Sequence, residues 1–320
     1  GLTTTEMQDY NTFTDESNSW LTSAWDFVTN PNDDAGNDDY WDMDQEGTVN
    51  NGYPILSWQG GADNSLQKYS GGSGTSDEPY LIANTADLIL LSTESGDWDA
   101  HFEQTADITF NSDETQVDWD GDGTVGDAGD ANGFSPIGLY RGSDFTGSYN
   151  GQDYTISNLY IDRSPQKGVG LFGEVSDATF RNVTLDAALV NGDDYVGAFI
   201  GKADSDTHIE NIHTTGETAI EASRYVGGLV GYLGISVETI TNCSTTGTVK
   251  GTQLVGGLAG DVRESTIENS SSSADIHAIS SSSLSASGFL GGLVGRSQGV
   301  SIDSCHATGN VNVASDISVN

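Results

Sequence analysis

The chain has 320 residues, of which 35% are hydrophobic, and its formal net charge at pH 7 is −38, from 48 acidic and 10 basic residues. A field of that sign repels nucleic acid and anionic membrane surfaces, so we expect neither as a partner. No stretch approaches the run of about 20 apolar residues that a membrane span requires, so we expect no membrane insertion. The same charge favours solubility, cation binding or a high-salt environment, in which screening weakens the repulsion.

Residues 1–58 are rich in aromatic side chains but show little periodic structure. We expect too small a core here to cover them, because the segment is short and rich in loops. Glycine pairs at 60–61 and 71–72 predict a flexible linker over 59–74. The chain starts at Gly1 and shows no signal peptide, from which we expect a processed chain or a piece of a longer one. The aromatic residues of this segment include Trp20, Trp25, Phe27, Tyr40, Trp41, Tyr53 and Trp58.

After the linker, residues 77–82 have the composition of a strand, and a short helix is expected next. Thr85 is its predicted N-cap, and the helix is predicted over 86–91. Asp87 then lies near the positive end of the helix dipole. These residues therefore predict a small, partly helical element in front of the repeats described below.

An acidic motif, Asp-Trp-Asp-Gly-Asp-Gly-Thr-Val, occupies residues 118–125. Carboxylates at alternate positions followed by glycine match the opening of an EF-hand-type loop, where they converge on one calcium ion. The twelfth position holds Gly129 in place of the usual glutamate, and Asp127 or Asp130 is expected to substitute. The alternative is a solvated acidic loop, although crowding carboxylates without a cation costs repulsion. The expected calcium ligands are Asp118, Asp120, Asp122, Thr124, Asp127 and Asp130.

A second acidic run lies at residues 33–47, with less regular spacing. A solvated loop is the favoured interpretation there, and a second calcium site is the alternative.

From Phe134 onward the chain repeats two phrases. The first has five copies, whose first aliphatic residues are 27, 30, 29 and 35 positions apart. A period near 30 is typical of a stacked repeat architecture. The second phrase, Ile-x-Asn, alternates apolar and polar residues as strands do, and Thr-Gly pairs supply turns. We therefore predict an all-β fold, a β-solenoid of about six coils over 134–320. The first phrase begins at Val169, Val196, Val226, Val255 and Leu290.

These phrases resemble the GLUG repeats of large surface proteins and adhesins of bacteria and archaea. The resemblance covers roughly 134–320 and implies a β-solenoid that is extracellular or at the cell surface, and it implies no chemistry. It also implies that residues 75–133 form an N-terminal cap, whose helix would protect an open sheet edge. Residues 1–58 resemble the closing segment that follows the last coil in GLUG proteins, but here the segment comes first.

The chain has two cysteines, and each is the fourth residue of a copy of the second phrase. Cys243 and Cys305 occupy the same position in it, and Ser270 occupies that position in the coil between them. Two coils are about 9.6 Å apart, whereas a disulfide requires Cα atoms within about 7 Å. We therefore predict inward-facing free thiols instead of a disulfide.

Asparagine also recurs in the second phrase, as Asn158, Asn182, Asn211, Asn242 and Asn269. One interpretation is glycosylation, because Asn182, Asn242 and Asn269 stand in Asn-x-Ser/Thr sequons. The other is a ladder of amides that hydrogen-bond from coil to coil. The ladder is favoured because Asn158 and Asn211 take the same position without a sequon.

The sequence contains no His-Glu-x-x-His, and its one Gly-x-Ser-x-Gly match, at residues 295–299, continues the last repeat phrase instead of joining a strand to a helix as a nucleophile elbow does. We therefore expect a structural protein and not an enzyme. The alternative class is a carbohydrate-binding or polysaccharide-cleaving solenoid. For that class the nearest constellation is Asp193, Asp194 and Arg224 on neighbouring turns, which are related only by the repeat register.

Other copies of the chain are the first expected partner, and surface glycans are the second. Residues 1–58 carry aromatics without a core, and the last coil, 302–320, has nothing recognisable to cover it. A head-to-tail contact would cover the aromatic side chains of one chain and the last coil of its neighbour. Such a contact would propagate as a fibre. A covalent version, in which the chain is one unit of a tandem protein, remains an alternative.

Overall fold

The computed structural model describes residues 41–43, 54–56, 68–121, 123–234, 239–279 and 288–312. The chain divides into two compact units between Lys68 and Tyr69. The described residues of the first unit form one antiparallel pair, β1 (Trp41–Met43) with β2 (Pro54–Leu56). The rest of the aromatic segment and of the acidic run at 33–47 lies outside the described residues.

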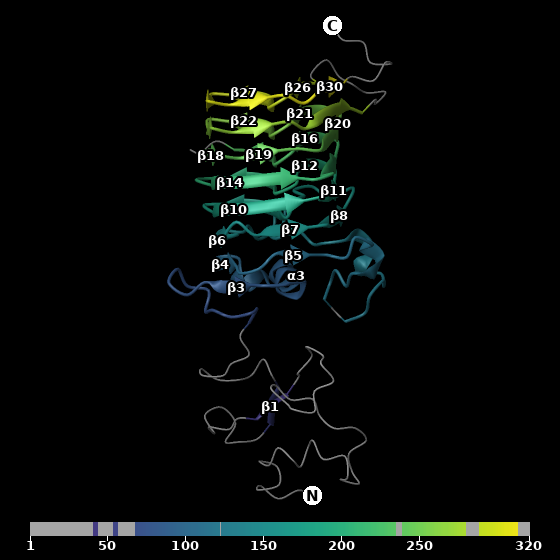
Figure 1. The fold of residues 1–320 in the computed structure, drawn as a ribbon, viewed down its shortest axis with the longest axis vertical. Coiled ribbons are helices and arrows are strands. Elements are labelled where there is room, and N and C mark those ends of the chain that lie inside the picture. Colours follow the sequence, from purple (N-terminus) through teal and green to yellow (C-terminus); the bar gives the residue numbers. More distant parts are fainter. Residues whose placement is uncertain are drawn as a thin grey trace, which may run out of the picture. The chain divides into compact units, whose positions relative to one another are not determined.

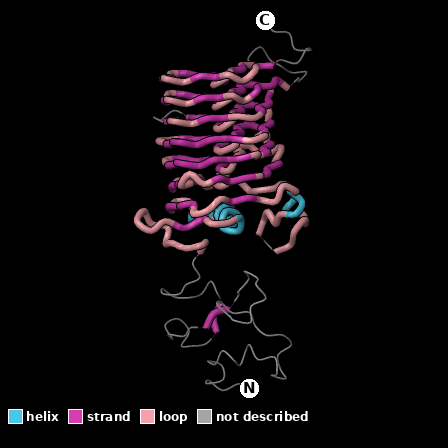
Figure 2. Tube along the Cα trace, in the orientation of Figure 1, coloured by secondary structure: helices cyan, strands magenta, loops and turns pink. Residues whose placement is uncertain are grey.

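The described part of the second unit is the predicted β-solenoid: strands of successive coils pair in parallel and stack into four sheets (Figure 1 and Figure 2). Sheet I contains β3 (Tyr80–Ile82), β4 (His101–Gln104), β6 (Ser148–Asn150), β10 (Thr179–Asp186), β14 (His208–Thr215), β18 (Thr239–Thr241), β23 (Thr266–Glu268) and β28 (Ser301–Asp303). It is extended by β5 (Ile108–Thr109), β7 (Thr155–Ser157), β19 (Ser244–Thr245), β24 (Ser271–Ser272) and β29 (His306–Ala307).

The other three sheets follow in chain order within each coil. Sheet II contains β8 (Tyr160–Asp162), β11 (Leu189–Asn191), β15 (Ala219–Glu221), β20 (Thr248–Gly251), β25 (Asp275–Ala278) and β30 (Val311–Asn312). Sheet III contains β12 (Asp194–Gly197), β16 (Arg224–Gly227), β21 (Gln253–Gly256) and β26 (Leu290–Gly291). Sheet IV contains β9 (Phe172–Ser176), β13 (Ile200–Asp204), β17 (Val230–Leu233), β22 (Ala259–Arg263) and β27 (Val294–Gln298).

The coil count is smaller than expected when only complete coils are considered. Within the described ranges, four coils give a strand to every sheet, and they span β10–β13, β14–β17, β18–β22 and β23–β27. The coil before them, β6–β9, reaches sheet III only through a single bridge between Val169 and Val196. The coil after them contributes β28–β30. The predicted figure of about six thus includes two incomplete coils.

The core is a column of inward side chains that repeat from coil to coil. Ile209, Ile240 and Ile267 are aligned in register, and each is 0% exposed. Toward the N-terminal end the column becomes aromatic, and the Phe172 and Phe180 rings lie 4.6 Å apart. Because each fully buried side chain of this size contributes about 1.5–3 kcal/mol, every coil stabilises its neighbours.

The glycines of the first phrase allow sheets III and IV to touch through their backbones. A Cβ added at Gly231 in β17 would lie 2.4 Å from the amide nitrogen of Val196 in β12, one coil earlier. The contact repeats in the next coil, where a Cβ added at Gly260 in β22 would lie 2.5 Å from the amide nitrogen of Val226 in β16. Carbon atoms pack at about 3.5–4.0 Å, so only glycine fits at these positions. The repeated glycine therefore has a steric cause.

The N-terminal end of the solenoid carries the predicted helix, α3 (Thr85–Thr93), followed by the 3₁₀ turn η2 (Ser95–Asp97) (Figure 1). The predicted N-cap was wrong by one residue: Asn84 is the cap, and its Oδ1 accepts from the Asp87 amide at 2.9 Å. Asn84 is extended (φ −152°), the conformation in which a side chain reaches back to the first turn. In the described part of the chain, no helix is long and apolar enough to cross a membrane.

The predicted linker, residues 59–74, extends too far toward the C-terminus, because residues from Tyr69 onward belong to the solenoid. Tyr69 is only 7% exposed and packs edge-on against Phe102, with ring centroids 5.6 Å apart. The Ser70 amide donates to the Leu81 carbonyl at 3.0 Å, and Leu81 donates to Gly71 at 2.8 Å. Residues 69–71 are thus paired with β3, as part of the solenoid.

The asparagine ladder is confirmed only in part: in the described coils, amide hydrogen bonds join Asn182 and Asn211, and none of this kind joins Asn242 or Asn269. Asn211 donates to Asn182 at 3.0 Å, and Asn182 donates to Asn150 at 3.1 Å. Asn158 instead follows β7: its backbone amide donates to the Asp186 carbonyl at 3.0 Å, and its side chain donates to the Phe110 carbonyl at 3.0 Å. Placing Asn158 in the ladder was therefore wrong, and Asn150 belongs there. Asn182, Asn211, Asn242 and Asn269 all have φ between 49° and 58°, a left-handed corner that asparagine tolerates.

The two cysteines are free thiols, as predicted. The Cys243 amide donates to Ser270 Oγ at 3.0 Å, and the Ser270 amide donates to Cys305 Sγ at 3.4 Å. Ser270 therefore occupies the coil between the two cysteines, which lie two coils apart in the predicted register. Cys243 is buried and Cys305 is partly exposed.

Candidate functional site

The acidic loop is anchored by a buried tryptophan. Trp119 is 1% exposed, stacks near Phe110 with centroids 4.8 Å apart, and donates from Nε1 to the Glu114 carbonyl at 2.9 Å. The loop lies between two 3₁₀ turns, η3 (Glu114–Gln116) and η4 (Asp130–Asn132). Burial of the Trp119 ring turns the carboxylates on either side of it toward one another.

Three of the predicted ligands converge. Carboxylate oxygens of Asp118, Asp120 and Asp130 lie within 4.8 Å of one another. Asp118 is held by the amides of Gly121 and Gly123, each at 2.7 Å, and Asp130 is held by the amides of Trp119 and Gly126. Of the two proposed substitutes for the twelfth position, Asp130 therefore joins the cluster. The other expected ligands are Asp127, which accepts from the Gly129 amide, Thr124, which is exposed, and Asp122, which lies outside the described residues.

The cluster offers three oxygen donors at a spacing compatible with calcium, which takes about six to eight oxygen ligands in all. Ca²⁺ binds oxygen at about 2.3–2.6 Å, so ligand oxygens on opposite sides of one ion are about 5 Å apart. The 4.8 Å span of the three carboxylates fits inside that limit. Each carboxylate oxygen has two lone pairs, so the oxygens that accept backbone amides keep capacity for a cation.

Two of the three residues that the sequence suggested for polysaccharide cleavage form an ion pair, in which the Asp194 carboxylate is buried and Arg224 is exposed. The third, Asp193, lies 3.7 Å from Lys167. Asp194, 2% exposed, accepts two hydrogen bonds from Arg224, at 3.0 and 2.6 Å, and one from Lys167. Burial alone would raise the pKa of Asp194, but the bonds from Arg224 and Lys167 lower it below its ordinary value. Both oxygens of Asp194 are committed to a cation on an adjacent coil. The ion pair thus fixes the alignment of these coils.

A second pair of this kind was missed from the sequence. Asp261, 0% exposed, accepts two hydrogen bonds from Arg296 at 2.8 and 2.6 Å and one from Arg263 at 3.2 Å. Asp261 and Arg296 are direct partners on β22 and β27. The sequence could have predicted this pair, because aligning the repeat phrases at Val255 and Leu290 places Asp261 and Arg296 at the same position of adjacent coils.

Tyrosines also stack along the coils. The Tyr195 and Tyr225 rings lie 4.5 Å apart and 12° from parallel, and Tyr140 stacks on Tyr195 at 5.5 Å. Burial raises the pKa of Tyr195 to about 12. Because the rings face one another across successive coils, the stack joins these coils.

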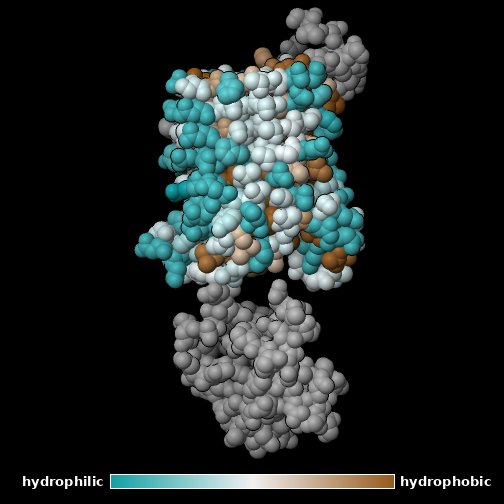
Figure 3. Space-filling model, viewed as in Figure 1, coloured by the Kyte–Doolittle hydropathy of each residue, from teal (hydrophilic) through white to brown (hydrophobic). Residues whose placement is uncertain are grey.

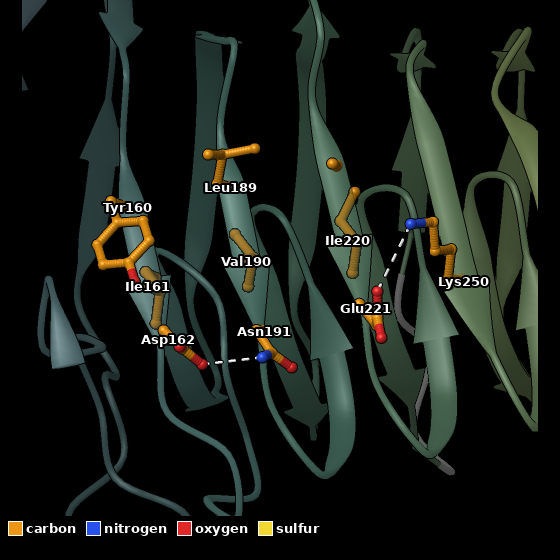
Figure 4. A pocket seen from close by; sticks show the side chains of 10 residues that line it. Tyr160, Ile161, Asp162, Leu189, Val190, Asn191, Ile220, Glu221 and Lys250 are labelled. Atoms are coloured by element: carbon orange, nitrogen blue, oxygen red, sulfur yellow. Dashed lines mark hydrogen bonds and ion pairs between the residues drawn. The ribbon is translucent and has the colours of Figure 1, made fainter. Parts of the chain in front are cut away.

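Sheet II carries a shallow groove of about 200 Å³ (Figure 4). The outward residues of β8, β11, β15 and β20 line it, while Ile161, Val190 and Ile220 between them are buried at 1–3% exposure. Two polar contacts cross the strands: Asn191 Nδ2 donates to Asp162 at 2.8 Å, and Lys250 lies 3.6 Å from Glu221. The face of the described coils that Figure 3 shows is mainly hydrophilic or near-neutral.

Comparison with known proteins confirms the resemblance found in the sequence, because the GLUG motif matches residues 222–250 and 290–312. The chain is 35% identical over 221 residues to halomucin of Haloquadratum walsbyi, a match that covers 67% of the chain and 2% of halomucin. It is 34% identical over 182 residues to an immunoglobulin A1 protease of Streptococcus sanguinis, covering 55% of the chain and 9% of the protease.

The fold also matches a solved structure. A protein from Bacteroides ovatus, provisionally named an immunoglobulin A1 protease, superposes with a TM-score of 0.51 at 18% identity. The match covers 79% of this chain and 83% of that protein. At this identity the likeness shows the fold alone. The chain spans only 2% and 9% of the halomucin and S. sanguinis relatives, so it is similar to a small part of each.

Proposed function

We propose that the chain is a structural, non-catalytic module of an extracellular cell-surface protein. The observation that carries this proposal is that the polar networks of the described coils join one coil to the next. The carboxylates of Asp194 and Asp261 and the amide of Asn211 are all used in this way. Relatives named for immunoglobulin A1, an extracellular antibody, support a location outside the cell.

The net charge of −38 supports the same location. Surface charges repel one another less as ionic strength rises, whereas ion pairs with a buried carboxylate, such as those of Asp194 and Asp261, are screened less. A solenoid built in this way keeps its alignment in strong salt. The name of one relative, halomucin of Haloquadratum walsbyi, fits a salt-rich environment.

The finer proposal is head-to-tail assembly, in which residues 1–58 of one copy, or of one tandem unit, cover the 302–320 region of the next. The last described coil supports it with exposed apolar side chains: Phe289, Ile302 and Val311 are 48%, 45% and 46% exposed. Among the described residues, β28, β29 and β30 pair on one side only, and such a parallel edge offers backbone groups to a partner. Because the contact uses two different surfaces, it propagates instead of closing.

Calcium is proposed as the cofactor of the acidic loop, bound by Asp118, Asp120 and Asp130. Its role is structural, since the loop adjoins the first strand of sheet II through a bridge between Gly133 and Ile161. An ion there removes the repulsion among three carboxylates.

Sedimentation of the full chain over a wide concentration range, in molar salt, tests the assembly. We expect the mass to rise with concentration and Ile302→Glu to reduce the rise. Glu210→Gln, on the exposed side of sheet I, is the matched control and should leave it unchanged. A monomer at all concentrations would contradict the assembly.

A further inference from the structure

We infer that the groove on sheet II binds a neutral oligosaccharide. Its wall combines an aromatic ring, Tyr160, and a 46% exposed leucine, Leu189, with two carboxylates, an amide and an ammonium group on the neighbouring column. Figure 4 shows Asp162, Asn191, Glu221 and Lys250 along that second column. Apolar contact beside convergent polar groups is the usual composition of a small-molecule site.

The register of sheet II explains the hollow. Tyr160, Leu189 and Ala219 follow one another at the same position of β8, β11 and β15. The small Ala219 side chain leaves space next to two large ones, and the column resumes with Thr248. The resulting space of about 200 Å³ lies below the roughly 300–1,000 Å³ of drug-sized pockets, so it suits a single ring while the rest of a ligand lies along the open face.

The polar groups match hydroxyls, each of which both donates and accepts. The Asn191 amide donates one hydrogen to Asp162 and keeps its oxygen and its second hydrogen. Lys250 contacts Glu221 at 3.6 Å, a loose pair in which the ammonium keeps donors for another group. Acceptors and donors thus follow one another across the strands of sheet II, from Asp162 to Lys250, as a polyhydroxylated ligand requires.

Other occupants fit less well. A peptide that adds as a strand needs a free sheet edge, but β11, β15 and β20 are paired on both sides, and β8 is bridged by Gly133. A polyanion is repelled by the net charge of −38. The apolar part of the wall is too small for a helix face. A neutral glycan therefore remains, and the inference is independent of head-to-tail assembly.

The test is titration calorimetry of the full chain with four neutral probes: chitohexaose, cellohexaose, xylohexaose and mannohexaose. We expect at least one to bind, and both Ala219→Tyr, which fills the hollow, and Leu189→Ala to weaken it at least tenfold. Leu139→Ala is the matched control, because Leu139 is also exposed (41%) and is not part of the groove, and it should leave affinity unchanged.

Thermal melting checks that each variant is folded, and if Ala219→Tyr fails this check, Leu189→Ala decides. The inference is overturned if none of the four probes binds, or if binding is unchanged in the folded groove variants. It is also overturned if Leu139→Ala weakens binding as much as they do. None of these outcomes changes the sedimentation result that tests assembly.

Discussion

Replacing Gly231 with alanine tests the physical account of the repeated glycine. The new Cβ would lie 2.4 Å from the Val196 amide nitrogen, 2.5 Å from the Gly201 carbonyl oxygen and 2.7 Å from the Tyr195 carbonyl carbon. All three atoms are backbone, so the strands of adjacent coils must separate by about 1 Å to reach van der Waals distance. Overpacking costs about 1–3 kcal/mol, and we expect the upper end because no side chain can yield.

The assay is thermal unfolding followed by circular dichroism. A loss of about 3 kcal/mol lowers the melting temperature of a unit of this size by roughly 6–12 °C. Gly96→Ala is the matched control, since an added Cβ there meets nothing within 4 Å, and its stability should change by no more than about 0.5 kcal/mol. If Gly231→Ala melted like the control, close backbone approach would not be the reason for glycine in this motif.

Three further predictions concern the acidic loop, the ion pair of Asp194 and the two cysteines. Calcium at about 100 times its dissociation constant should stabilise the protein by about 2.7 kcal/mol. Chelator should reverse this gain, Asp120→Asn should lack it, and the exposed control Asp206→Asn should keep it; a chelator-insensitive melting temperature would contradict the site. The pKa of Asp194 is lowered in the fold, so its ion pair stabilises above the unfolded pKa of about 3.9 and the contribution is lost as pH falls through the lower, folded value. Asp194→Asn should therefore cost about 2 kcal/mol at pH 7 and progressively less in acid, and a cost independent of pH would refute this assignment. Mass spectrometry after alkylation should find no disulfide, with Cys243 slower to react in the folded protein because burial raises its pKa to about 12; an intramolecular bridge to Cys305 would reverse the thiol assignment.

Most of the fold follows from periodicity. The spacing near 30 and the alternation in Ile-x-Asn were enough for a parallel solenoid, and the Cys243–Ser270–Cys305 column followed from alignment alone. Alignment failed where the first coil departs from the repeat. Asn158 matches the phrase in letters, but β7 pairs with the second half of β10, so the residue lies at a different corner.

The sites were less predictable, because they depend on contacts between coils. The alternating aspartates of the acidic loop were evident from spacing, whereas the choice of Asp130 over Asp127 was left open. That choice depends on how the buried Trp119 ring folds the loop back. The groove on sheet II has no motif. It arises because alanine follows leucine at one register position, which becomes visible only once the strands are paired.

Head-to-tail assembly is the central claim about function, and cross-linking tests it directly. A photoreactive amino acid in place of Ile302 would be activated in an equal mixture of isotopically light and heavy chains, and the products would be identified by mass spectrometry. A second chain with the label in place of Glu210 controls for random contact. We predict mixed light–heavy cross-links from position 302 to residues 1–58, and none to that segment from position 210. Cross-links that join 302 to residues 1–58 only within one chain, or no cross-links between them, would contradict the account.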